Sequence, residues 1–565
     1  DEHGSTSEVA ALKAGVPVQQ LVSQMHDKQA KTLARYGIDL DVYAGTARPD
    51  TYPTHAAFCQ EQLKKLHANG MLDKRTSKQW YDVEAKRFLP DRLVTGTCPR
   101  CGAAGAYSDE CDTCFSQYTP SELVDPKSAV SGSVPEMRDT THWFLDMAKV
   151  QDPLLAFIKS KEKKWRPPVY RAVLELVSPA LRFDKASEPA YLEVKAALPK
   201  HKQLTAPGKK VMLRFESRAD LDKARAQLSF TTELADEWAH RSITRDIAWG
   251  IPVPDVDPDL SGKTLYVWPD SLWAPISFSK VARADGEDFW RDPNARVVQF
   301  LGQDNVFFYV IMQGALWLGA QTDPQQLPHA GDLQMTDVVG AFHLLVNGEK
   351  MSKTKGNFYT GDQLLEERGY DADQIRYYLA LLDLSEKGSD FDFKKLDERN
   401  RFLAGPLNAS LERPISAAHS KFDGKVPDGK LLPEVEKATV RVVERYVKAM
   451  ERADFSNLLS EHIENYARTI NSLFTQHKPH DDRAPLEMRI NALYSGFYVL
   501  KTLMIMLYPF APATMNRVRE SLRLPASVFA LSELGTPIPA GHQLGDKQQY
   551  FPATPDAPAS APVDG

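Results

Sequence analysis

Two lysines spaced three residues apart stand in a glycine-flanked stretch from Val346 to Asn357, with the sequence VNGEKMSKTKGN. Lys350 and Lys353 suit a migrating negative charge, because a lysine ammonium group is a compact point charge on a flexible stem. A flexible loop can close such groups onto phosphates as the transition state forms. We therefore interpret the charge as the phosphate tail of ATP. A lysine-rich turn after an apolar strand is also common as a solvated hairpin, so charge patterning alone leaves both interpretations open.

Four of the five cysteines, Cys98, Cys101, Cys111 and Cys114, form two Cys-x-x-Cys knuckles. Two such knuckles can bring four thiolates around one tetrahedral ion, and four sulfur ligands leave no open position for water. We predict a structural Zn2+ site that fastens a small lobe and performs no chemistry. Two disulfides, or knuckles that have lost their metal, are the alternatives, although a large chain without a secretion signal favours free thiols. Cys59 stands alone, and we expect it to be buried as a small apolar side chain.

The composition is that of a multidomain globular protein. Of the 565 residues, 42% are hydrophobic and 25% are charged. No uninterrupted apolar run approaches the roughly 20 residues of a membrane span, and the polar start is not a signal peptide. We expect a cytoplasmic protein with no membrane partner; the sequence indicates no oligomeric state. The net charge of -6 gives no global attraction to nucleic acid, so any RNA contact must depend on local basic surfaces.

The coarse pattern predicts a nucleotide-binding α/β domain that is interrupted by a long insertion and followed by a helical domain. Residues 9–69 have a helical pattern. The runs 264–268 and 297–301 are typical of strands, and ligands of such sheets bind beyond the carboxyl ends of the strands. Within the insertion, residues 209–215 predict a strand with a polar helix after it. We assign no function to the segment 181–232.

From about Phe402 the pattern is helical for more than a hundred residues. Between Glu434 and Ala453, apolar residues recur at helical spacing and predict one buried face. A second set forms a basic stripe that could follow an RNA backbone: Lys437, Arg441, Arg445, Lys448 and Arg452. A solvated face is the alternative, because three glutamates lie nearby. After Phe551 the chain is rich in Pro, Ala and Asp, and we expect a flexible tail without an appended RNA-binding domain.

The lysine-rich stretch closely resembles the KMSKS signature of class I aminoacyl-tRNA synthetases in its methionyl form, with Thr354 in place of the usual second serine. Other stretches resemble that family in the same order: Thr244-Arg245-Asp246, Trp249-Gly250-Ile251-Pro252-Val253-Pro254, Leu265-Tyr266-Val267-Trp268, Gly302-Gln303-Asp304-Asn305 and Gly369-Tyr370-Asp371-Ala372-Asp373. The resemblance runs from Asp1 to about Phe551. An ordered series over the whole chain is more specific than any single motif.

The resemblance implies a Rossmann-like class I catalytic domain, split by a zinc-containing connective insertion and followed by an α-helical anticodon-binding bundle. The catalytic domain would occupy residues 1–70 and 261–338, with the insertion at 71–260 and its zinc knuckle at 98–114. Three further segments would follow: the KMSKS loop and stem-contact region at 339–400, the bundle at 401–525, and a C-terminal extension with a flexible tail at 526–565. The implied activity is that of an aminoacyl-tRNA ligase, which activates methionine with ATP and Mg2+ and esterifies tRNA.

The resemblance also implies roles in the chemical step. Lys350 and Lys353 would be catalytic. The residues that would bind ATP are Gly302, Asp304, Leu344, Lys350, Met351, Ser352 and Lys353. Among them, Gly302 and Asp304 would approach the ribose, where a carboxylate can accept hydroxyl hydrogen bonds. The alternative for Asp304 is a helix N-cap.

Recognition of the amino acid and of the tRNA is implied at four positions. Asp1 opens an Asp-Glu-His-Gly stretch similar to the family's Asp-x-His-Gly, whose aspartate holds the substrate α-amino group. Trp268 and Tyr309 would lie beside the amino-acid side chain, where an aromatic wall suits a thioether; ordinary core is the alternative for Trp268. His480 takes the position of the family's anticodon-stacking tryptophan, and a histidine can also stack on a base.

Some positions depart from the family. No His-x-Gly-His occurs in the sequence, although the family's HIGH motif precedes its Asp-x-His-Gly, and loss of such a donor set commonly costs about 3 to 4 kcal/mol. Because residue 1 is Asp and not Met, we expect the chain as given to lack its extreme N terminus. Tyr309 replaces a family histidine and Ala341-Phe342 replace a His-Gly pair, changes that could redirect specificity. A catalytically impaired protein that binds tRNA or a partner, and a paralogue that activates another amino acid, are therefore alternatives.

Overall fold

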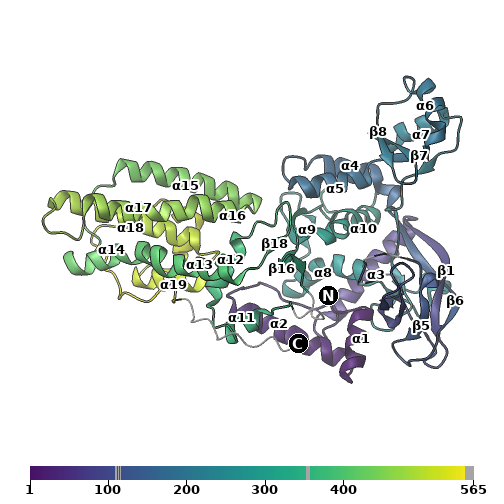
Figure 1. Cartoon of the computed structure of the whole chain (residues 1–565), viewed down its shortest axis with the longest axis horizontal. Helices are drawn as coiled ribbons and strands as arrows, with labels where there is room; N and C mark the ends of the chain where they lie inside the picture. Colours follow the sequence, from purple (N-terminus) through teal and green to yellow (C-terminus); the bar gives the residue numbers. More distant parts are fainter. Residues whose placement is uncertain (109–110, 112, 115, 117, 352–356, 554–565) are drawn as a thin grey trace. The chain divides into compact units, whose positions relative to one another are not determined.

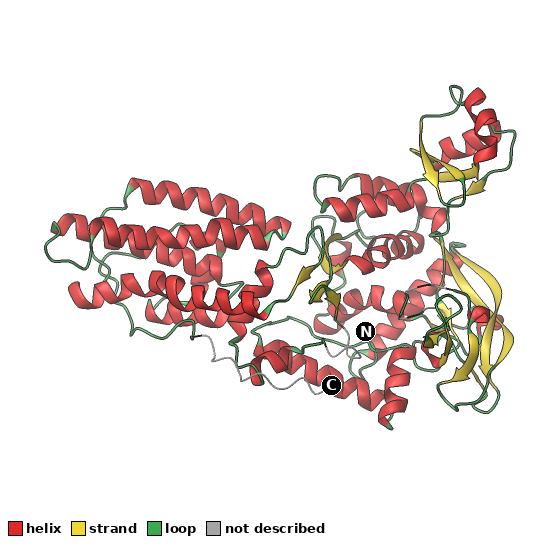
Figure 2. Ribbon diagram, viewed as in Figure 1, coloured by secondary structure: helices red, strands yellow, loops and turns green. Residues whose placement is uncertain are grey.

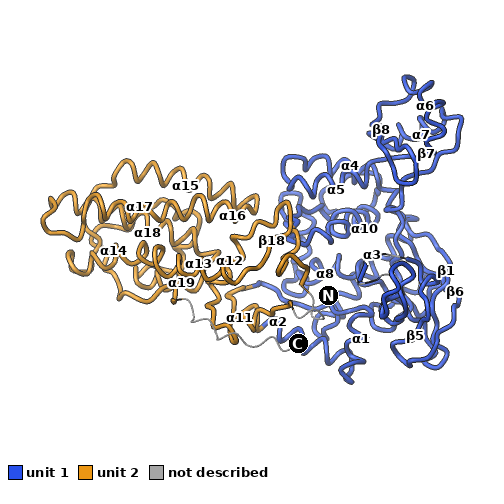
Figure 3. Tube along the Cα trace, viewed as in Figure 1, with its two compact units in different colours: residues 1–30, 40–340 blue, residues 31–39, 341–565 orange. Residues whose placement is uncertain are grey.

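The computed structural model describes residues 1–565 with the exception of 109–110, 112, 115, 117, 352–356 and 554–565. Two of the expected ATP-binding residues, Ser352 and Lys353, therefore lie outside the described residues. The chain divides into two compact units (Figure 3). Residues 1–30 and 40–340 form the first unit, and residues 31–39 and 341–565 form the second.

The first segment of the chain is helical, as its pattern predicts. Its three helices are α1 (Ser5–Ala14), α2 (Val18–Arg35) and α3 (Tyr52–Ala68). Helix α1 ends where Gly15 adopts a left-handed conformation with φ 66°, which glycine reaches at little steric cost. Helix α3 buries Leu63, Leu66 and Cys59 completely in the core of the first unit, which confirms the expectation for the lone cysteine.

The nucleotide-binding part contains a strand pair, and the helix α10 (Gln313–Ala320), labelled in Figure 1, lies between its two strands along the chain. Strand β14 (Val298–Gly302) pairs with β15 (Asp337–Ala341), and three helical elements run between them. These elements are η6 (Gln303–Asn305), the π-helix η7 (Phe307–Met312) and α10 (Gln313–Ala320). The strand predicted at 297–301 is thus confirmed to within one residue.

The strand predicted at 264–268 is only partly correct. Strand β13 (Thr264–Leu265) ends after two residues, and helix α8 (Val267–Ala282) starts at once. Pro269 lies in the first turn of α8, where the missing N–H of proline would have no partner within the helix. Trp268 is therefore a helical residue and not the end of a strand. The apolar run was misleading because short buried helices and strands share composition.

The insertion contains two antiparallel sheets in addition to its small domain. The larger sheet has the order β11-β6-β1-β2, and the smaller one β4-β3-β5. Their strands are β1 (Leu72–Asp82), β2 (Arg87–Phe88), β6 (Glu136–Asp146) and β11 (His240–Ser242), then β3 (Val94–Thr97), β4 (Ala104–Tyr107) and β5 (Val124–Ser128). Strands β1 and β6 form a long ladder from Leu72↔Leu145 to Tyr81↔Glu136. The four knuckle cysteines belong to the smaller sheet and its loops.

The segment without an assigned function folds as a separate α+β domain after α4 (Gln151–Lys159) and α5 (Pro167–Val177). Its elements are β7 (Ala180–Asp184), α6 (Glu188–Val194), β8 (His201–Ala206), β9 (Lys210–Phe215), α7 (Arg218–Gln227) and β10 (Glu233–Leu234). The predicted strand and the polar helix after it are confirmed as β9 and α7. Figure 2 shows the strands of this domain on one side and its helices on the other.

The second unit is mainly a helical bundle, as the sequence predicts. Its long helices are α12 (Ala372–Leu381), α13 (Phe393–Phe402), α14 (Asn408–Lys421), α15 (Pro433–Arg452), α17 (Glu464–His477), α18 (Leu486–Leu507) and α19 (Pro512–Ser521). Helix α15 buries Val435, Val442, Tyr446 and Ala449, which confirms its predicted apolar face. The bundle core continues to Phe551 near the end of the described chain.

Helix α18 is, among the described residues, the one helix whose length and hydropathy would suffice for a membrane span. Charged residues interrupt this helix at Glu487, Arg489 and Lys501, so the expectation that no uninterrupted apolar run reaches the length of a membrane span is not contradicted. In addition, 83% of the most apolar window of α18 is buried inside the structure. Leu500, Leu503 and Met504 are fully buried in the core of the second unit. We conclude that α18 is the central helix of the bundle.

Candidate active site and metal site

The end of strand β14 positions the two residues expected near the ribose. Gly302 ends the strand and is the N-cap residue of η6, so Asp304 itself does not occupy the N-cap position. Asp304 is exposed. A Cβ atom on Gly302 would lie 2.4 Å from Oδ1 of Asp304, far below van der Waals distance. A larger residue at position 302 would therefore displace this carboxylate, which follows the carboxyl end of the strand, where ligands of α/β sheets bind.

Trp268, one of the two aromatic residues expected beside the amino acid, belongs to a pair of stacked rings. Trp268, in the first turn of α8, stacks on Phe308 of the π-helix with ring centroids 3.5 Å apart and an interplanar angle of 4°. Tyr309, the next residue, is half-buried, and burial raises the pKa of its phenol. Tyr309 lines a small cavity with Trp317 and Met335, a cavity to which Trp268 does not contribute. The structure therefore brings Trp268 against the neighbour of Tyr309 and not against Tyr309 itself.

The Asp-Glu-His-Gly stretch is anchored by its second and third residues. Glu2 is buried and accepts a hydrogen bond of 2.8 Å from the N–H of Ala47. The indole N–H of Trp249 donates to the carbonyl of Glu2 at 2.8 Å, which joins two of the segments that carry the family resemblance. Asp1 is exposed. The residue expected to hold the substrate amino group thus directly precedes this anchored stretch.

A buried polar cluster lies beneath this stretch. Asp270 of α8 has His3 Nδ1 2.7 Å from its Oδ2, and it also contacts Nε2 of His55. His55 Nδ1 in turn lies 2.7 Å from Oγ of Ser277. Burial disfavours the charged carboxylate, but the hydrogen bonds from His3 and His55 outweigh this effect and lower the pKa of Asp270 to about 2. The cluster fastens the start of the chain to α3 and α8.

His3, His55 and Asp270 are not among the site residues predicted from the sequence. A signal was available, because Asp270 is the one charged residue in the apolar run from Tyr266 to Phe278. A buried carboxylate is costly unless it is paired, so an acidic residue in such a run indicates a buried partner. His55 carried no comparable signal, since nothing local marks its contact with a residue 215 positions away.

The lysine-bearing stretch forms a hairpin in the second unit. Strand β16 (Leu344–Val346) pairs with β17 (Glu349–Lys350) through the turn residues Asn347 and Gly348, whose φ angles are 55° and 75°. Positive φ at both positions is typical of a type I′ turn, which Asn-Gly favours. The N–H of Gly348 donates to Oδ1 of Asp390 at 2.6 Å and anchors the turn.

The packing residues of the hairpin are distinct from its exposed lysine, Lys350. Leu344 and Met351 are half-buried and pack against the core formed by Tyr36, Leu364 and Tyr370. Lys350 is exposed. Leu344 and Met351 therefore position the hairpin, while the ammonium group of Lys350 is available to a phosphate.

The four knuckle cysteines converge. Their sulfur atoms all lie within 4.8 Å of one another, with Cys98 Sγ 3.7 Å from Cys114 Sγ and Cys101 Sγ 3.8 Å from Cys111 Sγ. A Zn–S distance of about 2.3 Å in a tetrahedral site requires sulfur separations of about 3.8 Å. A disulfide requires about 2.05 Å, and all four thiols are free. The residues present therefore fit a structural Zn2+ ion, and the disulfide alternative is excluded for these residues.

The backbone around Cys98 also suits a metal-bound thiolate. The N–H groups of Arg100 and Cys101 donate to Sγ of Cys98 at 3.4 and 3.5 Å. Desolvation opposes the thiolate, but these hydrogen bonds outweigh it and lower the pKa of Cys98. Metal-bound sulfur must be deprotonated, so this arrangement favours the ligand form.

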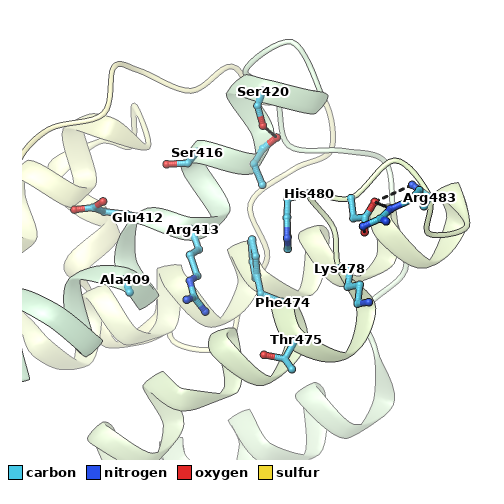
Figure 4. A pocket seen from close by; sticks show the side chains of 12 residues that line it. Ala409, Glu412, Arg413, Ser416, Ser420, Phe474, Thr475, Lys478, His480 and Arg483 are labelled. Atoms are coloured by element: carbon cyan, nitrogen blue, oxygen red, sulfur yellow. Dashed lines mark hydrogen bonds and ion pairs between the residues drawn. The ribbon is translucent and has the colours of Figure 1, made fainter.

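His480 lies at the rim of an open cavity of about 820 Å3 at the C-terminal end of α17 (Figure 4). Its ring is exposed and parallel to that of Phe474, with centroids 5.9 Å apart and an interplanar angle of 8°. Arg413 lines the same cavity and donates to Oδ1 of Asn471 at 2.7 Å. An exposed ring beside an arginine can stack on an unpaired base.

Comparison with known proteins identifies the family. A family model described as "tRNA synthetases class I (M)" matches residues 1–205 and 203–415. The chain belongs to this family. The expected enzyme class, an aminoacyl-tRNA ligase of class I, is thereby confirmed, and the order of the resembling segments has its explanation in common descent.

Curated relatives of this family match nearly the whole chain. The methionine--tRNA ligase of Chlorobium phaeobacteroides is 29% identical over 571 residues, which cover 96% of this chain and 71% of the relative. The methionine--tRNA ligase of Bacteroides fragilis is 29% identical over 573 residues, which cover 100% of this chain and 73% of the relative.

Solved structures share the fold. The methionyl-tRNA synthetase of Mycobacterium tuberculosis, bound by methionyl-adenylate, superimposes with a TM-score of 0.67 at 19% sequence identity. The match covers 98% of this chain and 90% of that chain. The ligand-free form of the same synthetase gives a TM-score of 0.63 at 16% identity. The predicted class I architecture is confirmed at the level of the fold.

Proposed function

We propose that this protein is a methionine--tRNA ligase, which activates methionine with ATP and transfers it to tRNA during translation in the cytoplasm. The observation that carries the proposal is the match of the family over residues 1–415, together with relatives named methionine--tRNA ligase that span the chain. The aromatic stack of Trp268 on Phe308 supports the choice of amino acid, because aromatic rings suit a polarizable thioether.

The described residues support defined roles in adenylate formation. Gly302 leaves space for the carboxylate of Asp304, which would accept hydrogen bonds from the ribose hydroxyls of ATP. Asp1 would pair with the α-amino group of the substrate. The substrate carboxylate then attacks the α-phosphate in line. Lys350 and Lys353, together with Mg2+, would stabilise the departing pyrophosphate. The terminal hydroxyl of the tRNA would then attack the carbonyl carbon of the aminoacyl-adenylate, form the ester and release AMP. No covalent intermediate on the enzyme is needed.

The proposed function also assigns a role to each segment of the chain. Residues 1–70 and 261–338 would form the catalytic domain and 71–260 the connective insertion, whose knuckle at 98–114 would hold Zn2+. Residues 339–400 would carry the lysine hairpin and the stem-contact region. Residues 401–525 would bind the anticodon, with His480 stacking on a base at the cavity of α17. Residues 526–565 would be the C-terminal extension.

Amino-acid-dependent exchange of pyrophosphate into ATP tests the activity. We expect the complete gene product to catalyse exchange with methionine. Its kcat/KM should be at least about 100-fold lower with leucine or isoleucine, which lack a thioether, since pocket contacts worth about 1 to 3 kcal/mol each accumulate. Exchange with another amino acid would support the paralogue. Binding of tRNA without exchange by any amino acid would support the catalytically impaired alternative.

A further inference from the structure

The small domain within the insertion has a recognisable topology. Its chain order is β7-α6-β8-β9-α7-β10, and its antiparallel sheet has the order β10-β7-β9-β8. This is a split βαββαβ arrangement, with both helices on one face of the sheet and the other face open. The same architecture presents the open face of a four-stranded sheet to RNA in common RNA-binding modules.

Side-chain alternation separates the two faces. Val211, Leu213 and Phe215 of β9 are buried in a core that also contains Tyr191 of α6 and Leu221 of α7. The intervening residues of β9 therefore lie on the open face: Lys210, Met212 and Arg214. The domain thus has its own core, and the open face contributes nothing to that core.

The open face is cationic toward one edge. Cross-strand pairing places Arg214 opposite Lys202 of the edge strand β8, and Lys210 opposite Ala206. The turn that joins β8 to β9 adds Lys209, at φ 57°. Between residues 180 and 235 there are eleven lysines and arginines and seven acidic residues, in a chain whose net charge is -6. The domain is therefore a local basic surface on an acidic protein.

Ion pairs show where the available charge lies. Arg182 on β7 contacts Glu237, Lys210 pairs with Glu233 at 2.6 Å, and Arg214 lies 3.7 Å from Glu175, so acidic groups compensate these three cations of the open face. Lys202 and Lys209 are both exposed and, in the described part of the chain, form no ion pair. The β8–β9 edge thus carries two cations that are free to contact a polyanion.

We propose that the β8–β9 edge of this domain, through Lys202 and Lys209, binds the phosphate backbone of tRNA as a contact additional to the anticodon bundle. The open-face positions of β8 and β9 carry no aromatic side chain, so base stacking is not available there and the contact positions the RNA without reading its sequence. This inference rests on the proposed function, because it takes tRNA as the partner.

The test compares two variants with the same change of charge in the full chain. Lys202→Glu/Lys209→Glu reverses the edge, and Lys223→Glu/Arg225→Glu reverses two exposed residues of α7 on the helical side. We measure Kd for tRNA by fluorescence anisotropy at several salt concentrations. The edge variant should raise Kd by about 10-fold near 0.1 M salt and lower the slope of log Kd against log salt by about 1.5 to 2, while the α7 variant leaves both unchanged.

The outcomes separate this inference from the proposed function. If the unaltered protein does not bind tRNA, the proposed function fails. If it binds tRNA and the edge variant binds equally well, the inference alone fails, and the lysines then serve only to prevent the edge strand from pairing with another sheet. Equal weakening by both variants would also overturn the inference, because it would indicate general electrostatic attraction. Methionine-dependent pyrophosphate exchange without tRNA should be unchanged in both variants, which shows that the fold is intact.

Discussion

His3 Nδ1 lies 2.7 Å from Oδ2 of Asp270, although the two residues are 267 positions apart in the sequence, and both side chains are almost fully buried. Asp270 also contacts His55, so one carboxylate joins the start of the chain to helices α3 and α8. Asp1, the expected amino-group ligand, is two residues from His3. The cluster therefore restricts the position of the backbone next to Asp1, which is a positioning role.

Asp270→Asn should destabilise the first unit by about 3 kcal/mol at pH 7, because it removes one member of a buried charged cluster. Since the pKa of Asp270 is lowered to about 2 from an ordinary 3.8, the carboxylate stabilises the folded protein fully above about pH 5. This contribution, about 2 kcal/mol, is lost as the pH falls toward 2. The difference between the variant and the unaltered protein should therefore shrink over that range.

Tryptophan fluorescence during urea unfolding measures this effect in the first unit alone, since all nine tryptophans precede residue 341. Asp285→Asn is the matched control, because Asp285 is an exposed carboxylate paired with Arg283 on the surface. It should change the urea midpoint little at pH 7. An Asp270→Asn midpoint equal to that of the control would show that the cluster has no stabilising role.

The zinc site should depend on the knuckle cysteines and not on the fifth cysteine. We expect one equivalent of zinc per chain by plasma emission spectrometry, and loss of that metal in Cys98→Ser/Cys101→Ser, because a hydroxyl is a poor substitute for a thiolate ligand. Cys59→Ala is the control: Cys59 is fully buried in another core and should leave the zinc content unchanged. Full zinc content in the double variant would disprove the assignment.

Local patterns in the sequence predicted the elements that local interactions determine. The spacing of Cys98, Cys101, Cys111 and Cys114 was sufficient to predict their convergence, because each knuckle is a short turn. The predicted strand at 297–301 and the buried face of α15 were also correct, since a short apolar run bounded by loop residues is typical of a strand and helical periodicity reflects burial. A local sequence pattern predicts contacts only between residues that are close in the sequence.

Contacts between distant segments could not be predicted in this way. The run at 264–268 has the composition of a strand, but Pro269 suits the first turn of a helix, and α8 begins at Val267. The His55–Asp270 contact depends on how α3 and α8 pack, which no local pattern encodes. Similarly, the length and hydropathy of α18 do not distinguish a membrane-spanning helix from the core helix of a bundle. The burial of α18 in the bundle makes this distinction.

Lys350→Ala should lower kcat for pyrophosphate exchange by about 100- to 1000-fold with little change in the KM for methionine, because the ammonium group would act on charge that develops in the transition state. Lys350 is exposed at the end of the β16–β17 hairpin, so its removal should not disturb the fold. Lys394→Ala, at an exposed position of α13, is the control and should retain full exchange. Unchanged exchange in the Lys350 variant would refute the role proposed for this lysine.

His480→Ala should raise the KM for tRNA in aminoacylation by about 5- to 100-fold, since stacking of a base on an aromatic ring is worth about 1 to 3 kcal/mol. The ring of His480 is exposed and held parallel to Phe474, so the loss should come from the missing stacking surface. His480→Trp enlarges that surface and should bind tRNA at least as well as the unaltered protein.

His477→Ala, at the last position of α17, is the control, because His477 does not line the cavity. Pyrophosphate exchange, which requires no tRNA, should be equal in all four proteins. If the KM for tRNA is the same in His480→Ala and His477→Ala, the anticodon does not bind at this cavity.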